Sequence, residues 1–271
     1  MGHPAIAAGN VAVVTGAALG IGRALAKRFV TEGMKVALLD VDVEGLHEAR
    51  AEIGGETEAI LCDVAEIEAL EHTQARIAET WGKAPTVLVN NAVTRIGRGI
   101  EAPLEDWRRA IDINLFGVIN GVRAFLPSMR ASGAPGMIVN VGSKQGITNP
   151  PGHPAYNMAK AAVRSYTESL EHELRQAEDQ KISAHLLVPG WTTTGHNEHK
   201  PGAWRPDQVV DYLLAAVESS SFYVVCPDDE VSEAQDKARI LWGAEDITQN
   251  RPPLSRWHPD WKDGYVRKEP K

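Results

Sequence analysis

A tyrosine and a lysine stand four positions apart in PAYNMAK, residues 154–160. Residues at this spacing share one face of a helix, so the phenol of Tyr156 and the ammonium of Lys160 would be neighbours. Free tyrosine, with a pKa of about 10, is a poor base at neutral pH. An opposite charge within about 4–6 Å stabilises the phenolate, so Lys160 would lower the pKa of Tyr156. The pair could move a proton on and off a substrate oxygen, although this spacing is also common on ordinary helical surfaces.

A second candidate site is the glycine-rich segment TGAALGIG (residues 15–22), which follows an apolar run and precedes a predicted helix. Glycines allow positive φ and close backbone approach, and N–H groups at a helix start attract a pyrophosphate. Asp40 ends the next apolar run, where a dinucleotide site has an acid, about 20 residues on, that binds the ribose hydroxyls. Its carboxylate would repel the 2′-phosphate of NADP, and neither Val41 nor residues 17–19 supply a cation. These residues therefore favour NAD, although glycine-rich turns also occur without a ligand.

The elements that must position these residues alternate along the chain. Short runs rich in Val, Ile and Leu predict strands at residues 11–15, 35–40, 59–64, 86–90, 137–141, 183–188 and 222–226. Amphipathic segments predict helices at Ile21–Glu32, Val43–Ile53, Glu66–Trp81, Pro103–Arg130, Ala155–Ala177 and Pro206–Ser219. This alternation indicates an α/β fold: one Rossmann-like domain with a doubly wound parallel sheet of about seven strands and helices on both faces.

Composition sets limits on the class of protein. A net charge of −8 argues against non-specific binding to nucleic acid or to an anionic membrane, because both attract cations. Cys62 and Cys226 form no spacing pattern; one disulfide is an open alternative, but two lone thiols fit a reducing cytoplasm better. No apolar run approaches the roughly 18 residues of a membrane span, and no signal-peptide pattern stands at the amino terminus. We therefore expect a soluble, cytoplasmic protein with a small-molecule substrate.

The spacing TGxxxGxG, together with motifs further along the chain, resembles the classical short-chain dehydrogenase/reductase family. The motifs stand in the family's order: Asp63-Val64, Asn90-Asn91-Ala92, Asn114 within IDINLFG, Ser143, Tyr156 with Lys160, and Pro189-Gly190 followed by Thr194. Each motif is weak alone, but together they cover residues 11–226. Their combined order is what makes the resemblance specific.

The resemblance implies an NAD(H)-dependent oxidoreductase that interconverts a secondary alcohol and a ketone by hydride transfer. Tyr156 would be the general acid/base, and Lys160 would lower its pKa and hold the nicotinamide ribose. Ser143 would orient the substrate oxygen, and Asn114 would hold a water in a proton relay. The alternatives are a non-catalytic NAD-binding sensor or scaffold, and an epimerase or dehydratase. The intact catalytic set weighs against the first, and the form of the glycine motif weighs against the second.

The same resemblance assigns the contacts to NAD. They are Thr15, Gly16, Leu19, Gly20, Ile21, Gly22, Asp40, Val41, Asp63, Val64, Asn90, Asn91, Ala92, Tyr156, Lys160, Pro189, Gly190, Thr192 and Thr194. One departure is Val93, which stands where the family prefers glycine. Its side chain would narrow the space near the nicotinamide ribose.

Substrate recognition is the least specified property. The candidates flank the motifs and are polar, cationic or aromatic: Arg95, Lys144, Asn149, His153 and Trp191. They motivate a polar substrate, either anionic or polyhydroxylated, and the alternative is that Arg95, Lys144 and Lys200 are solvated loop charges. His196 and His199 share one loop without a third ligand at a suitable spacing, so we expect no catalytic metal.

The chain divides into a catalytic domain, residues 1–230, and a carboxyl-terminal segment, residues 231–271, that is dense in Pro, Trp and charge. Val231–Trp242 could form one more helix. The aromatic residues that follow would be poorly solvated in water. We expect them to pack on the domain or on a neighbouring subunit.

The two long predicted helices, residues 103–130 and 155–177, carry apolar residues on more than one face. In the family the corresponding helices pair across a two-fold axis. The resemblance therefore implies a homotetramer, with a dimer as the second choice.

Overall fold

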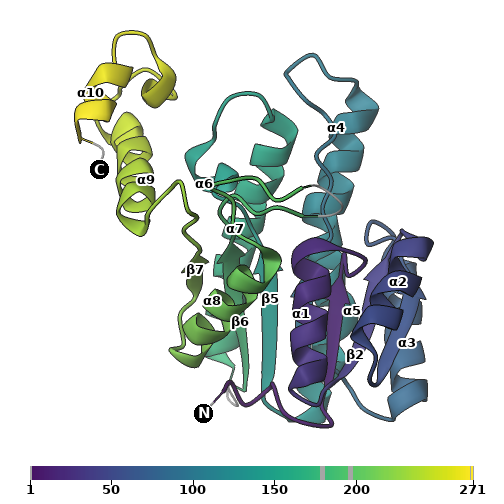
Figure 1. Cartoon of the computed structure of the whole chain (residues 1–271). Helices are drawn as coiled ribbons and strands as arrows, with labels where there is room; N and C mark the ends of the chain where they lie inside the picture. The colour runs from purple at the N-terminus through teal and green to yellow at the C-terminus, as the bar shows by residue number, and fades with distance from the viewer. Residues whose placement is uncertain (1, 178–180, 195–197, 269, 271) are drawn as a thin grey trace.

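Seven parallel strands form the central sheet of the computed structural model, which describes residues 2–177, 181–194, 198–268 and 270 (Figure 1). The strands are β1 (Val11–Thr15), β2 (Lys35–Asp40), β3 (Thr57–Leu61), β4 (Val87–Asn90), β5 (Gly136–Val141), β6 (Ile182–Val188) and β7 (Tyr223–Val225). Their order, β3-β2-β1-β4-β5-β6-β7, confirms the predicted doubly wound sheet. Because the direction of winding reverses between β1 and β4, the loops after these strands diverge and leave a crevice.

Helices cover both faces of the sheet, as predicted. They are α1 (Gly20–Thr31), α2 (Val43–Ile53), α3 (Ile67–Trp81), α4 (Leu104–Ile111), α5 (Gly117–Ser132), α6 (Gln145–Thr148), α7 (Pro154–Gln176), α8 (Pro206–Glu218), α9 (Glu233–Thr248) and α10 (Lys262–Lys268). One face is covered by α1, α2 and α8, whose apolar side chains share a buried cluster. The other is covered by α3, α5 and α7. Each strand is therefore held from both sides.

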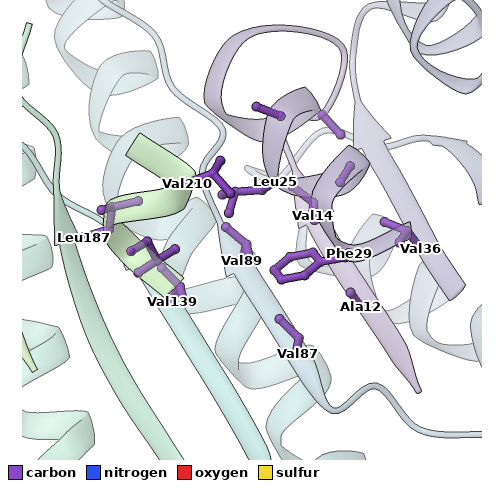
Figure 2. Close-up of a cluster of buried hydrophobic side chains, with 14 of the residues drawn as sticks. Ala12, Val14, Leu25, Phe29, Val36, Val87, Val89, Val139, Leu187 and Val210 are labelled. Carbon is purple, nitrogen blue, oxygen red and sulfur yellow. The ribbon is translucent and has the colours of Figure 1, made fainter. Parts of the chain in front are cut away.

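Alternate strand residues supply the two cores. Ala12 and Val14 of β1 point towards α1 and α8, whereas Val11 and Val13 belong to the opposite cluster. Figure 2 shows Phe29 of α1 lying over β1 and β4. Phe29 is fully buried, so truncating it to alanine would destabilise the fold by about 3–5 kcal/mol. This double core fixes the strand ends from which the crevice is built.

Two elements differ from the prediction near the crevice. β3 ends at Leu61, so Asp63 and Val64 lie in the loop beyond the strand. The helix predicted over residues 103–130 is interrupted by a π-helical turn, η1 (Asp112–Phe116), between α4 and α5. A π-helical turn inserts a residue without ending the helix, so the hydrophobic pattern on either side conceals it.

The carboxyl-terminal segment forms α9, a short 3₁₀ turn η2 (Ser255–Trp257) and α10, which extend beyond β7 (Figure 1). α9 begins at Glu233 and reaches Thr248, longer than predicted, and Ser232 caps it reciprocally with Gln235.

The aromatic residues of this segment pack on one another. The buried Trp242 lies edge-on to Tyr265, with ring centres 5.3 Å apart. The guanidinium of Arg251 lies 4.4 Å from the Trp242 ring and 5.5 Å from the Trp261 ring. Trp242 also donates a 2.6 Å hydrogen bond from Nε1 to Ser255. The segment therefore has a small core of its own.

Two further expectations bear on the whole chain. Across the described ranges, no helix is long and apolar enough to cross a bilayer. Cys62 and Cys226 are buried free thiols, and burial raises the pKa of Cys226 to about 12. Both side chains therefore act as small apolar residues in the core.

Candidate active site

A pocket of about 630 Å³ lies where the loops after β1 to β6 meet, at the predicted crevice. Its lining comes from the whole length of the catalytic domain: Gly16, Leu19, Gly20, Ile21, Asp40, Val41, Cys62, Asp63, Val64, Asn91, Ala92, Val93, Thr94, Arg95, Arg109, Ile113, Val141, Gly142, Ser143, Tyr156, Lys160, Pro189, Gly190, Trp191, Thr192, Thr193, Thr194 and Lys200. Most residues assigned to NAD from the sequence are among them. The exceptions are Thr15, Gly22 and Asn90. They do not line the pocket, but their contacts hold the loops and strand ends around it.

The glycine-rich loop packs so closely on its neighbours that side chains at its glycines would collide with them. Gly16 has φ +65°, and a Cβ there would lie 2.9 Å from Cα of Ala92. A Cβ at Gly22 would lie 2.1 Å from the carbonyl oxygen of Gly16. The side chain of Asn91 donates to the carbonyl oxygens of Thr15 and Gly16, at 3.0 and 3.1 Å. The loop is therefore held close to β4, and α1 begins directly behind it.

Thr15 and Asn90 hold the strand ends together. The hydroxyl of Thr15 accepts the N–H groups of Asn91 and Ala92, at 2.9 and 3.0 Å. Asn90 donates from Nδ2 to the side-chain oxygen of Asn140, at 2.8 Å, and both are buried. The structure places these two residues behind the pocket wall.

Asp40 presents a fixed carboxylate at the end of β2. One oxygen accepts the N–H of Ala18 in the glycine-rich loop at 3.0 Å, and the other accepts the N–H groups of Val41 and Asp42 at 2.8 and 3.1 Å. The group is therefore oriented by backbone donors towards the region where a dinucleotide's ribose would bind. No cation stands beside it in the described lining.

Asp63 lies beyond β3 and pairs with a residue that the sequence analysis missed. Its carboxylate is 2.5 Å from Nη2 of Arg109 on α4, and it also accepts the N–H of Ala65 at 3.0 Å. Arg109 carries no motif signal, since it is one of several charged residues on a short amphipathic helix.

Tyr156 and Lys160 lie on successive turns of α7, as predicted. Tyr156 is 5% exposed, and the Nζ atom of Lys160 lies 5.9 Å from the centre of its ring. Lys160 is 2% exposed and donates to the carbonyl oxygen of Val141 at 2.7 Å. Burial, and secondarily the positive charge of Arg95, lower the pKa of Lys160 to about 7. Its charge can therefore change near neutral pH.

Ser143 follows β5 and faces the same pocket as Tyr156. Its hydroxyl accepts the N–H of Gln145 at 3.1 Å, which fixes the turn into α6. Gly146 allows α6 to approach α7 closely, because a Cβ at this position would lie 2.5 Å from the carbonyl carbon of Lys160. Close packing of α6 on α7 thus brings the serine loop to the tyrosine helix.

Asn114 is fully buried in η1 and does not line the pocket. Its side chain donates to the carbonyl oxygen of Thr94 and accepts the N–H of the same residue, both at 2.9 Å. Both polar groups of the amide are therefore used to hold the loop that carries Val93 and Arg95. Val93 is 52% exposed in the pocket, where its side chain takes up space as expected.

The five substrate candidates separate into two groups. Arg95 and Trp191 line the pocket. Lys144 does not: its ammonium lies between the buried carboxylates of Asp228 and Asp236, at 3.3 and 2.6 Å.

The other two candidates also lie outside the pocket lining. Asn149 accepts a 3.0 Å hydrogen bond from Asn157, and His153 precedes the first turn of α7. Burial, then the charges of Arg98 and Arg95, lower the pKa of His153. Several lining residues had no place in the sequence-based site, among them Thr193, Ile113 and Lys200, the last of which was expected to be a solvated charge if not a substrate residue.

The loop after β6 closes the pocket over the glycine-rich loop. Gly20 has φ +60°, and a Cβ there would lie 3.0 Å from the side chain of Thr194. The N–H of Trp191 donates to Asp228 at 2.8 Å, which fixes the turn after Gly190. His196 lies outside the described residues. Within them, no group of three or more potential metal ligands comes together.

Comparison with known proteins gives the same assignment as the motifs. Residues 10–203 match the family model described as short chain dehydrogenase. SadH of Mycobacterium tuberculosis is 42% identical over 191 residues, 69% of this chain and 68% of SadH. A short-chain dehydrogenase/reductase from Burkholderia phymatum, solved in complex with NAD, is 30% identical with a TM-score of 0.82, over 91% of this chain and 96% of that chain.

A metagenomic short-chain oxidoreductase, solved in complex with NADP, is 30% identical with a TM-score of 0.69, over 82% of this chain and 98% of that chain. Structural relatives thus include proteins with either cofactor. The residues matched by the family model include every residue that lines the pocket. The chain belongs to the short-chain dehydrogenase/reductase family of oxidoreductases.

Proposed function

We propose that the protein interconverts a secondary alcohol and a ketone with NAD(H) as the hydride carrier. The observation that carries this proposal is the meeting of Ser143, Tyr156 and Lys160 at the wall of a pocket that also contains the glycine-rich loop. When bound, the nicotinamide supplies or accepts the hydride, and the protein contributes position and proton transfer.

The cofactor site is supported by shape and by chemistry. In the loop from Gly16 to Gly22, a Cβ at any of the three glycines would collide with neighbouring protein atoms, so the glycines keep the loop in its tight turn at the start of α1. Asp40 would accept the ribose hydroxyls of the adenosine half. Asp63, Val64 and Arg109 would border the adenine, and the loop from Pro189 to Thr194 would cover the nicotinamide end.

Tyr156 would take the proton from the substrate hydroxyl as hydride leaves the carbinol carbon, and would return it in the reverse reaction. The hydroxyl of Ser143 would hydrogen-bond the same oxygen and orient it. Lys160, in its charged form, would favour the phenolate and donate to the nicotinamide ribose. Asn114 would hold a water in a proton relay, and the two hydrogen bonds of its side chain to Thr94 fix the residue in place.

The preference for NAD over NADP is supported by Asp40. A 2′-phosphate would face a carboxylate, and the nearby Arg109 already pairs with Asp63. The repulsion and the missing cation both disfavour NADP.

A homotetramer, or failing that a dimer, is supported by exposed apolar side chains on neighbouring elements. Leu104 on α4, Phe116 in η1 and Met158 on α7 are 61%, 48% and 47% exposed. These three elements contact one another, so their apolar side chains could form one surface for a second copy. Light scattering at micromolar concentration should give a mass above that of one chain; a monomer would contradict this.

The function is tested by following NADH formation with sugars, hydroxy acids, and cyclic and aromatic alcohols, with NADP in parallel. We expect turnover with NAD and a loss of about 100-fold or more in Ser143→Ala, because a preorganised donor is removed. Ser169→Ala is the matched control, since Ser169 is exposed on α7 and bonds only to its own helix. Equal losses in both variants, or none in either, would count against the proposed role.

A further inference from the structure

Positive and negative charges occupy opposite ends of the pocket. Asp40 and Asp63 are the acidic residues of the described lining, and both lie at the end where β2 and β3 finish. Backbone N–H groups bind the first carboxylate, and Arg109 pairs with the second. Neither acid is therefore available to neutralise charge near the catalytic residues.

The catalytic end carries cations instead. Arg95 lines the pocket there, and its charge acts on the buried Lys160, while Lys200 is a further cation of the pocket lining. Within the described part of the chain, no carboxylate lies within ion-pairing distance of any of the three. The whole chain carries a net charge of −8, so this local excess of positive charge runs against the overall balance.

Arg95 is placed directly over the catalytic tyrosine. Its guanidinium carbon lies 5.1 Å from the centre of the Tyr156 ring. Its backbone is fixed, because the preceding residue, Thr94, exchanges two hydrogen bonds with the buried Asn114. The side chain itself is exposed in the pocket. An arginine whose backbone is fixed and whose guanidinium makes no ion pair within the described chain is well suited to bind an anionic ligand.

This position is unfavourable for the free protein. The charge of Arg95 is one of the two causes that lower the pKa of Lys160, so the two cations oppose each other. It also opposes protonation of His153. A bound anion at Arg95 would offset this repulsion. It would also lie near the Tyr156 hydroxyl, because the guanidinium lies over the ring that carries this hydroxyl.

We propose that the substrate is a hydroxy acid, a secondary alcohol whose carboxylate pairs with Arg95 while its hydroxyl meets Tyr156 and Ser143. The planar fork of an arginine matches a carboxylate in a bidentate pair, and Lys200 adds a second positive charge to the pocket lining. Oxidation leaves the carboxylate unchanged: the carbinol C–H bond breaks with its electron pair passing to NAD⁺ as hydride, and the hydroxyl proton passes to Tyr156. The inference rests on the proposed function and names its substrate class.

The kinetic test compares 2- and 3-hydroxy acids with their amides, which keep the carbon skeleton but lose the charge. The wild type should prefer the acids in kcat/KM. Arg95→Met should reduce that preference by about 10- to 100-fold, the effect expected for hydrogen bonds to a charged group. Arg98→Met is the matched control: it removes the same charge from the same exposed loop, but Arg98 does not line the pocket. Its acid-to-amide ratio should remain that of the wild type.

Equal use of acids and amides by the wild type would overturn the proposal and leave the oxidoreductase function standing. An equal loss of preference in Arg95→Met and Arg98→Met would also overturn the proposal. Such a result would indicate a long-range electrostatic effect of the loop's positive charge and not a direct contact with Arg95.

A binding experiment tests the anion site without turnover. Malonate, succinate, glutarate and their diamides are titrated into the protein loaded with NADH, with the nicotinamide fluorescence as readout. At least one dicarboxylate should bind about tenfold or more tightly than its diamide in the wild type and in Arg98→Met, but not in Arg95→Met. No preference for any dicarboxylate would refute the anion site. Carboxylate binding together with no oxidation of any alcohol would support the anion site and contradict the proposed function.

Discussion

The ammonium of Lys144 lies 2.6 Å from a carboxylate oxygen of Asp236, joining the residue after Ser143 to the first turn of α9. Asp228, the second partner of Lys144, also accepts the N–H of Trp191. One cluster of charges thus connects the serine loop, the loop after β6 and the carboxyl-terminal segment.

Removing Lys144 should destabilise the protein. Lys144→Met would leave Asp228 and Asp236, whose side chains are 3% and 7% exposed, without their cation. Unpaired buried charges are unfavourable, so we expect a loss of about 3 kcal/mol in the free energy of unfolding. Lys237→Met is the control, because the Lys237–Glu233 pair is exposed and screened by water, so its loss should leave the free energy of unfolding close to that of the wild type. Urea unfolding measures both; similar losses would contradict the structural role of Lys144.

The protonation of Lys160 should make stability depend on pH. Burial lowers its folded pKa from 10.5 to about 7, so between these values the unfolded chain binds the additional proton. Stability contributed by this residue therefore rises with pH across that window, with a slope of at most about 1.4 kcal/mol per pH unit. Urea unfolding of wild type and Lys160→Met should show the wild type gaining relative to the variant from pH 7 to pH 9. Parallel profiles would mean that the buried lysine keeps its charge.

Those features of the site that depend on short sequence spacings could be predicted. The strand–glycine–helix order placed Gly16 at the end of β1, and the four-residue spacing placed Tyr156 and Lys160 on one helical face. Uninterrupted apolar runs predicted strands buried on both faces, as in β1 and β5. These patterns are local, so one sequence is enough to read them.

Features that depend on distant contacts could not be predicted. Lys144 follows Ser143 and its position in the sequence suggested a substrate residue, but its partners come from more than eighty positions away. Arg109 reaches the loop residue Asp63 from α4, and nothing in the sequence around Arg109 indicates this contact. Gly146 is required by its close approach to α7, which only the packed structure reveals.

The glycine cradle gives a prediction about cofactor binding. Gly22→Ala should abolish NADH binding or weaken it at least about 100-fold, because the new Cβ would overlap the carbonyl of Gly16 at 2.1 Å and displace the loop. Gly243→Ala is the matched control, since a Cβ there meets nothing within 4 Å and alanine favours the helix. NADH fluorescence titration checks both, with circular dichroism to confirm folding. Normal binding by a folded Gly22→Ala protein would contradict the assigned phosphate site.

Asp40 should decide between the two cofactors. Asp40→Ser removes the carboxylate that would face a 2′-phosphate, so kcat/KM with NADP relative to NAD should rise by about tenfold or more. Asp42→Ser removes the same charge two residues away, where the side chain caps α2 and does not line the pocket. Its cofactor ratio should stay close to that of the wild type. A wild-type enzyme that prefers NADP would contradict the assignment outright.

The proposed function depends on proton transfer by Tyr156. The most direct measurement is a single-turnover experiment on Tyr156→Phe, with the alcohol that the wild type oxidises best. Tyr223→Phe is the control, because that hydroxyl is exposed and bonded only to Glu168. We predict that Tyr156→Phe binds NADH normally but transfers hydride about 10²- to 10⁴-fold more slowly, while Tyr223→Phe behaves as the wild type. Hydride transfer at the wild-type rate in Tyr156→Phe would contradict the account.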